Sequence, residues 1–151
     1  KLMPKASVKR LIDCKKKDLI RLVLDIEKYP EFIPFCYDAK IYESVETSKN
    51  IKIIADLTIG KGPFKDTYKS NVTFNKNENS IYVENIDGPL NHLENSWLFK
   101  EQNKATEVSF DIDFEIKNKF LNTIMSASFQ FGLENIVDAF QKRAEKLFNQ
   151  S

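Results

Sequence analysis

Few side chains in this sequence have the types and spacing that catalysis or metal binding requires. His92 is the only histidine, and Cys14 and Cys36 are the only cysteines among the 151 residues. The cysteines are too far apart in sequence for a metal-binding pair, and neither has a neighbouring histidine that would activate a thiolate. We therefore predict no catalytic residues and no metal ligands, and we favour a binding protein over an enzyme.

Acidic residues alternate along one stretch of the chain, at Asp111, Asp113 and Glu115. In a β-strand this spacing places all three on one face, while the apolar residues between them occupy the other face. We therefore expect these carboxylates to point into water rather than to act as an acid–base pair. Glu84 and Asn85, in an earlier predicted strand, are the candidates for a polar group that points inward.

Hydrophobic periodicity predicts the elements that position these residues. Apolar residues three and four apart indicate a helix over about 15–25 and a long helix from about 119 almost to the end of the chain. Alternation with a period of two predicts antiparallel strands at 5–12, 39–47, 51–60, 64–75, 80–87, 92–101 and 106–118. Turn residues separate successive strands, so the sheet should be a meander. Gly60 and Gly62 belong to one such turn and not to a phosphate loop, since no helix follows them.

A proline-framed aromatic segment follows the first helix, over residues 25–37. Pro30 and Pro34 each fix their own φ angle and disfavour a helical conformation in the preceding residue, so the segment cannot be one continuous helix. A short helical turn that holds the aromatic side chains in a cluster is expected. Two interpretations follow, a plug at one end of the core or a rigid apolar gate over a pocket.

Length and composition are those of one globular domain, spanning 1–151. Hydrophobic residues make up 42% and charged residues 30% of the chain, with a net charge of +1. No apolar run approaches the roughly 20 residues that a membrane-spanning helix needs. The two cysteines without a disulfide pattern favour a reducing, intracellular compartment. We expect the natural chain to start at Met3, so that Lys1 and Leu2 are additional residues before it.

Charge is unevenly distributed along the chain. Residues 1–21 contain eight Lys and Arg residues and only two Asp residues, so the remainder carries a net negative charge. A basic segment of this kind favours contact with anionic lipid or RNA. Such lysines more often form a solvated helix face, and both interpretations stay open.

Three motifs in this sequence resemble those of one known family. They are Asp25-Ile-Glu-Lys-Tyr-Pro-Glu-Phe-Ile-Pro-Phe-Cys36, Gly88-Pro-Leu-Asn-His-Leu-Glu-Asn-Ser-Trp-Leu-Phe99 and Ile136-Val-Asp-Ala-Phe-Gln-Lys-Arg-Ala144. In this order they resemble the motifs of the ubiquinone-binding, START-like family. That family is grouped with polyketide cyclase/dehydrase (SRPBCC) proteins and with the ribosome-association toxin.

The resemblance implies an α+β helix-grip (START-like) fold. Its seven-stranded curved antiparallel sheet wraps around the long C-terminal helix, with two short helices between strands 1 and 2 and an elongated apolar cavity between sheet and helix. Phe35, Leu90 and Ile136 stand where the family often has Trp, Phe and Met. These replacements are all apolar, so they bear on the shape of the ligand rather than on the fold.

The resemblance also implies a lipid-sized pocket lined by the inward faces of the strands and helix. The predicted pocket and gate residues are Tyr29, Phe32, Ile33, Phe35, Ile53, Leu57, Phe64, Tyr68, Trp97, Phe99, Phe110, Phe114, Ile124, Ser128 and Phe131. The gate combines the segment 29–35 with the hairpin 60–64, so that Phe32 and Phe35 lie over the cavity mouth.

Three functions are compatible with this resemblance. The leading hypothesis is non-enzymatic binding of a ubiquinone-like isoprenoid lipid in support of respiratory electron transport, with the lipid as ligand and no required cofactor. The alternative is association with the large ribosomal subunit, and a lesser one is a cyclase/aromatase-type enzyme. Anionic membrane is a further candidate partner, contacted through residues 9–21, whereas DNA is not expected. The expected location is the cytoplasm or the inner membrane surface, the matrix face in a mitochondrion.

Overall fold

The computed structural model describes residues 5–60, 62–88 and 90–148, and within these ranges it leaves out the side chains of residues 64, 121 and 124–128. Within that part of the chain, seven strands form one antiparallel sheet in the order β1-β7-β6-β5-β4-β3-β2. Strands β2 to β7 form the predicted meander, and β1 pairs with β7. The strands are β1 (Lys5–Ile12), β2 (Cys36–Glu46), β3 (Asn50–Ile59), β4 (Asp66–Asn75), β5 (Ser80–Asp87), β6 (Leu90–Gln102) and β7 (Ala105–Ile116).

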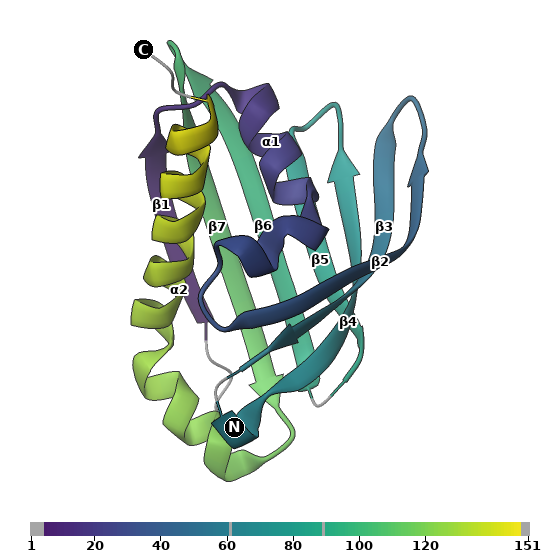
Figure 1. Cartoon of the computed structure of the whole chain (residues 1–151), viewed down its shortest axis with the longest axis vertical. Helices are drawn as coiled ribbons and strands as arrows, with labels where there is room; N and C mark the ends of the chain where they lie inside the picture. Colours follow the sequence, from purple (N-terminus) through teal and green to yellow (C-terminus); the bar gives the residue numbers. More distant parts are fainter. Residues whose placement is uncertain (1–4, 61, 89, 149–151) are drawn as a thin grey trace.

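The helices are α1 (Lys16–Leu24), the 3₁₀ helices η1 (Ile26–Glu31) and η2 (Gly62–Phe64), and the long α2 (Lys119–Phe148). Of these, α1, the short helix η1 after it and α2 lie on one side of the sheet (Figure 1). The two short helices between the first two strands are therefore α1 and η1, as predicted. Pro30 lies inside η1, whose tighter turn replaces the α-helix that the proline would interrupt.

A stripe on the second half of α2 joins the helix to the sheet. Leu133, Val137, Phe140 and Ala144 are buried at three- and four-residue spacing, which is the buried face of an α-helix. Arg10 on β1 forms an ion pair with Asp138 on α2 at 2.5 Å. The helix is thus held against both the concave face of the sheet and its β1 edge.

Phe131 was predicted to face the pocket, but it does not. Its side chain is 69% exposed, and that of Phe120 near the start of α2 is 73% exposed. Phe131 is two positions before Leu133, which is about 200° around a helix, so it points away from the face that Leu133 buries. Glu115 is a second correction, because it is buried and accepts a hydrogen bond from Asn91 instead of pointing into water.

None of the helices in the described part of the chain combines the length and apolarity needed to cross a bilayer.

Candidate functional site

A cavity of about 290 Å³ lies between the concave face of the sheet, η1 and α2. The helices and the turn after η1 contribute Val23, Ile26, Tyr29, Ile33, Phe129, Leu133, Ile136 and Phe140 to its lining. The strands contribute Cys36, Ala55, Leu57, Ile59, Tyr68, Ser70, Val72, Ile81, Val83, Leu90, Leu93, Asn95, Trp97, Phe110, Ile112, Phe114 and Ile116. Most of these side chains are aliphatic or aromatic, which is the usual character of a site for a small apolar ligand.

The register of the sheet orders the lining into rows across the strands. Phe110, Trp97 and Ile81 lie opposite one another on β7, β6 and β5. The next inward row toward the other end of the strands contains Ile112, Asn95 and Val83. Because side chains alternate between the two faces of a strand, these rows are two residues apart along each strand.

Aromatic rings close one end of the cavity. The indole of Trp97 stacks on Phe110 with ring centroids 4.3 Å apart, and it meets Phe140 edge to face at 5.2 Å. Phe140 also meets Tyr29 and Phe32 edge to face at 5.4 and 5.3 Å. These pairings add specific geometry to the burial of large apolar surfaces, so this end is a rigid floor.

The opposite end of the lining reaches the molecular surface. Ile59, at the end of β3, is 37% exposed and lines the cavity. The neighbouring Gly60 donates a backbone hydrogen bond to the carbonyl oxygen of Phe35 at 3.0 Å. The proline-framed segment and the β3–β4 connection therefore meet at the mouth.

The gate prediction was wrong for the side chains of Phe32 and Phe35. Phe35 has a φ of +62° and its ring is 55% exposed, so it turns away from the cavity. Phe32 packs against Phe140, with the guanidinium of Arg143 5.1 Å from its ring centre, and it acts as a plug outside the lining. Tyr29 and Ile33 are the members of this segment that face the cavity.

The predicted binding residues thus divide into three groups. Those that line the cavity are Tyr29, Ile33, Leu57, Tyr68, Trp97, Phe110 and Phe114. Those with described side chains outside the lining are Phe32, Phe35, Ile53, Phe99 and Phe131. The side chains of Phe64, Ile124 and Ser128 are outside what the structure describes. Ile53 and Phe99 are buried in the core instead, Phe99 stacked beside Trp97.

Two of the polar groups in this lining are Asn95 and Ser70. The Oδ1 atom of Asn95 is buried and has no hydrogen-bond partner among the described residues. Ser70 is buried two strands away on β4. Asn95 was missed from the sequence, although it shares the strand parity of Leu93 and Trp97 and could have been found that way. Glu84 and Asn85, which were considered instead, do not line the cavity.

The ionisable side chains of the described lining favour their uncharged forms. Burial raises the pKa of the Cys36 thiol to about 11. Burial also raises the pKa of Tyr68, and it raises that of Tyr29 far above its ordinary value. The Tyr29 hydroxyl already donates a hydrogen bond to the carbonyl oxygen of Val23. The lining is therefore neutral at physiological pH.

His92 lies on the outer face of the sheet and not in the cavity. Its Nε2 atom contacts a carboxylate oxygen of Asp113. Sheet pairing also brings Glu94 close, so that one potential ligand atom from each of the three side chains lies within 4.8 Å of the others. The sequence spacing had suggested no such set. Partly exposed acidic groups often lie this close without an ion, so we assign no metal to them.

A curved antiparallel sheet that grips a long helix around an apolar cavity defines the START-like class of folds. A START superfamily protein from Mycobacterium smegmatis has this fold, with a TM-score of 0.80 and 18% identity over 95% of this chain and 99% of that one. The family model described as polyketide cyclase / dehydrase and lipid transport matches residues 16–141. The chain belongs to this family.

Two relatives are similar in sequence as well. Ribosome association toxin RatA from Rickettsia prowazekii is 30% identical over 141 residues, covering 91% of this chain and 94% of that protein. The mitochondrial coenzyme Q-binding protein COQ10 of Dictyostelium discoideum is 30% identical over 135 residues, covering 86% of this chain and 63% of that protein.

Proposed function

We propose that this protein binds an elongated, uncharged lipid of the isoprenoid quinone type in the cavity, without catalysing a reaction on it. The observation that carries the proposal is the cavity itself, which is lined mainly by apolar side chains between the sheet and α2 and reaches the surface at Ile59. The name of the coenzyme Q-binding relative supports the same class of ligand. Support of respiratory electron transport follows from that ligand class.

The electrostatics of the lining support an uncharged ligand. Cys36, Tyr29 and Tyr68 all have pKa values raised by burial, so none of them offers a charge at neutral pH. A general acid or base works best with a pKa near the operating pH, which these groups do not have. The described lining thus favours binding over cyclase-type chemistry.

The size of the cavity limits how much of a lipid it can enclose. Its 290 Å³ is just below the range of roughly 300–1,000 Å³ for small-molecule pockets. A quinone head with the first isoprene units would occupy the cavity, and a longer tail would leave through the mouth beside Ile59. The protein would then work in the cytoplasm, at the surface of the membrane that supplies the lipid.

The single tryptophan of the chain provides a direct test. Trp97 lines the cavity at its aromatic floor, so a bound quinone head should quench its fluorescence. Titration with a short-chain ubiquinone is expected to give saturable quenching and a raised melting temperature, and native mass spectrometry of freshly purified protein should reveal a bound lipid. No quenching, no thermal shift and no co-purified lipid together would reject the proposal.

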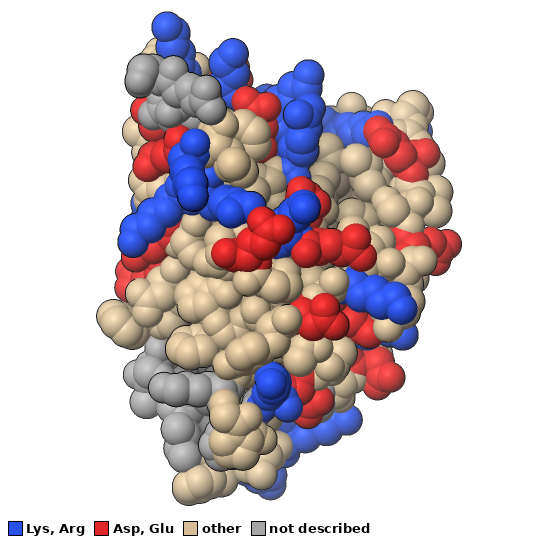
Figure 2. Space-filling model, in the orientation of Figure 1, with Lys and Arg blue, Asp and Glu red and all other residues tan. Residues whose placement is uncertain are grey.

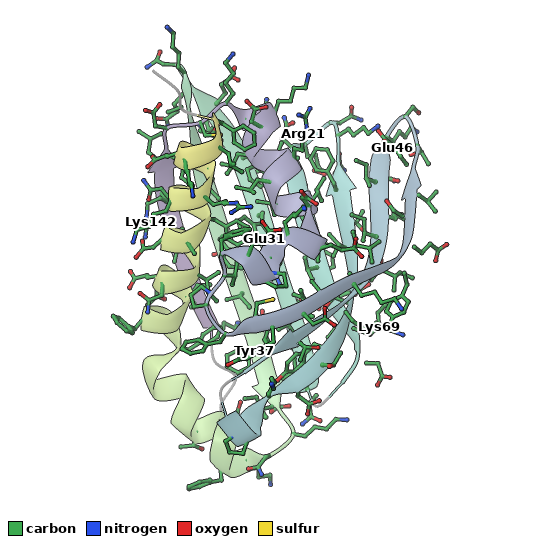
Figure 3. All side chains as sticks on the ribbon, in the orientation of Figure 1. Arg21, Glu31, Tyr37, Glu46, Lys69 and Lys142 are labelled. Atoms are coloured by element: carbon green, nitrogen blue, oxygen red, sulfur yellow. The ribbon has the colours of Figure 1, made fainter. Side chains whose placement is uncertain are left out.

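Ribosome association is a second candidate, favoured by the basic surface around α1. Lys15, Lys17 and Arg21 are exposed at this end of the molecule, and Figure 2 shows several Lys and Arg side chains along its upper edge. The side-chain hydroxyl of Thr106, near the start of β7, donates to the carbonyl oxygen of Cys14 just before α1. The other end of β7 is at the mouth side, where its last residue, Ile116, lines the cavity. In Figure 3, Arg21 lies near the upper end of the molecule, and Tyr37, next to the lining residue Cys36, lies well below it. The name of the RatA relative points to the same partner.

Because the basic surface and the mouth are at opposite ends, the two functions can be tested separately. The triple substitution Lys15→Glu, Lys17→Glu and Arg21→Glu should abolish co-sedimentation with ribosomes and leave quinone quenching unchanged. Co-sedimentation of the unaltered protein should also weaken as salt is raised, since phosphate contacts are salt-dependent. If the triple variant co-sediments as well as the parent, the basic surface is a solvated helix face.

A further inference from the structure

Asn95 is a polar side chain in an apolar setting, and its surroundings indicate what the cavity binds. Its cross-strand neighbours on the sheet are Ile112 on β7 and Val83 on β5, and both line the cavity. Along β6 the adjacent residues on the same face are Leu93 and Trp97, which also line it. The amide thus interrupts an otherwise apolar row. On the inward face of β6 it is the next side chain to Trp97, which belongs to the aromatic floor of the cavity.

The side-chain oxygen of Asn95 lacks the hydrogen bond that burial requires. Its Oδ1 atom is buried without a partner among the described residues. A buried acceptor without a donor destabilises the protein, and native structures rarely retain one without a reason. Ser70 cannot serve as the donor, because it lies two strands away on β4 and neighbouring strands are about 4.8 Å apart.

We propose that Asn95 binds the polar leading end of the lipid and selects a lipid with a hydroxyl group there, such as a prenyl alcohol or the reduced, quinol form of an isoprenoid quinone. This inference rests on the proposed lipid-binding function and adds an orientation and a chemical class to it. An O–H group donates to Oδ1, whereas an ether or a hydrocarbon cannot. The lipid enters with its polar end first, and its apolar remainder fills the part of the cavity between Asn95 and the mouth.

Matched ligands test this selectivity. Farnesol and farnesyl methyl ether differ only in the hydroxyl hydrogen that is replaced by a methyl group, and Trp97 fluorescence reports the binding of either. The unaltered protein should bind farnesol about 2- to 10-fold more tightly than the ether, the factor that one net hydrogen bond provides. In Asn95→Leu the two ligands should bind with about equal affinity, because the acceptor is gone. The ether should bind this variant at least as tightly as it binds the unaltered protein. Ser96→Ala, on the outer face of the same strand, is the control and should keep the preference.

The outcomes separate this inference from the proposed function. If neither farnesol nor the ether changes Trp97 fluorescence or the melting temperature, lipid binding itself is rejected. If both ligands bind but the unaltered protein does not prefer farnesol, or Asn95→Leu keeps the full preference, lipid binding stands and the role of Asn95 is overturned. A buried water that satisfies Oδ1 would give this second result.

The same comparison extends to the redox state of a quinone. A short-chain ubiquinol should bind more tightly than the matching ubiquinone to the unaltered protein, and Asn95→Leu should remove the difference. Competition against a fluorescent apolar probe under anaerobic conditions measures both affinities without dependence on quenching. Tighter binding of the quinone than of the quinol would contradict selection of a hydroxyl donor.

Discussion

Trp97 and Phe140 meet edge to face with their ring centroids 5.2 Å apart, and this contact joins the middle of the sheet to the long helix. It also joins two of the three sequence motifs, because Trp97 belongs to the second and Phe140 to the third. Tyr29 and Phe32 of the first motif pack on the same Phe140 ring. Arg143 of the third motif forms an ion pair with Glu31 of the first at 2.7 Å. Residues from all three motifs therefore form one cluster, and this cluster builds the closed end of the cavity.

Removal of the Phe140 ring should destabilise the whole fold. Phe140→Ala is expected to lower the free energy of unfolding by about 3–5 kcal/mol, because it leaves a void among three other aromatic rings. Phe131→Ala removes the same ring from the exposed face of α2 and should change stability by less than about 0.5 kcal/mol. Urea denaturation followed by circular dichroism measures both values. Equal losses in the two variants would contradict an α2 that buries Phe140 and exposes Phe131.

The backbone at Phe35 should favour glycine. Its φ of +62° is in the left-handed region, which costs a non-glycine residue about 1–2 kcal/mol. Glycine relieves this cost, but it loses more backbone entropy on folding, which costs about 0.5–1 kcal/mol. Phe35→Gly is therefore expected to be about 0.5–1 kcal/mol more stable than Phe35→Ala, which removes the same ring without relieving the backbone. A higher melting temperature for Phe35→Ala than for Phe35→Gly would argue against the left-handed backbone conformation at Phe35.

Lipid binding should protect one cysteine and not the other. Cys14 and Cys36 are both buried, and burial raises the pKa of each thiol to about 11, so both should react slowly with iodoacetamide at pH 8. Only Cys36 lines the cavity. Bound lipid should slow alkylation of Cys36 several-fold and leave Cys14 unchanged, as peptide mass spectrometry can measure. Equal protection of both would indicate global stabilisation and not occupancy of the cavity.

Stability should decrease in alkaline solution as the two buried thiols titrate. Their pKa is raised in the folded protein to about 11 from an ordinary value of 9.0. The unfolded chain thus loses these protons first, so their contribution is complete below pH 9 and is lost as the pH rises toward 11. The free energy of unfolding should fall over this interval, and less steeply in the double variant Cys14→Ala, Cys36→Ala. Identical slopes for parent and variant would assign the loss to other groups.

Periodicity alone determined much of this fold. The alternation on 106–118 predicted β7, and the spacing of Val137, Phe140 and Ala144 predicted the buried face of α2. The three motifs implied the seven-stranded sheet around that helix. Local propensity and side-chain alternation suffice for these features because they depend on neighbouring residues.

Only the tertiary structure decided which apolar side chains pack and which leave space between them. Parity placed Phe99 and Trp97 on the same face, but it could not tell that Phe99 joins the core while Trp97 also lines the cavity. Periodicity likewise could not show that Phe32 packs on Phe140 while Phe35 turns outward. The sequence pattern specifies the direction in which a side chain points. The volume left in front of it depends on the separation of sheet and helix, which contacts between distant residues determine.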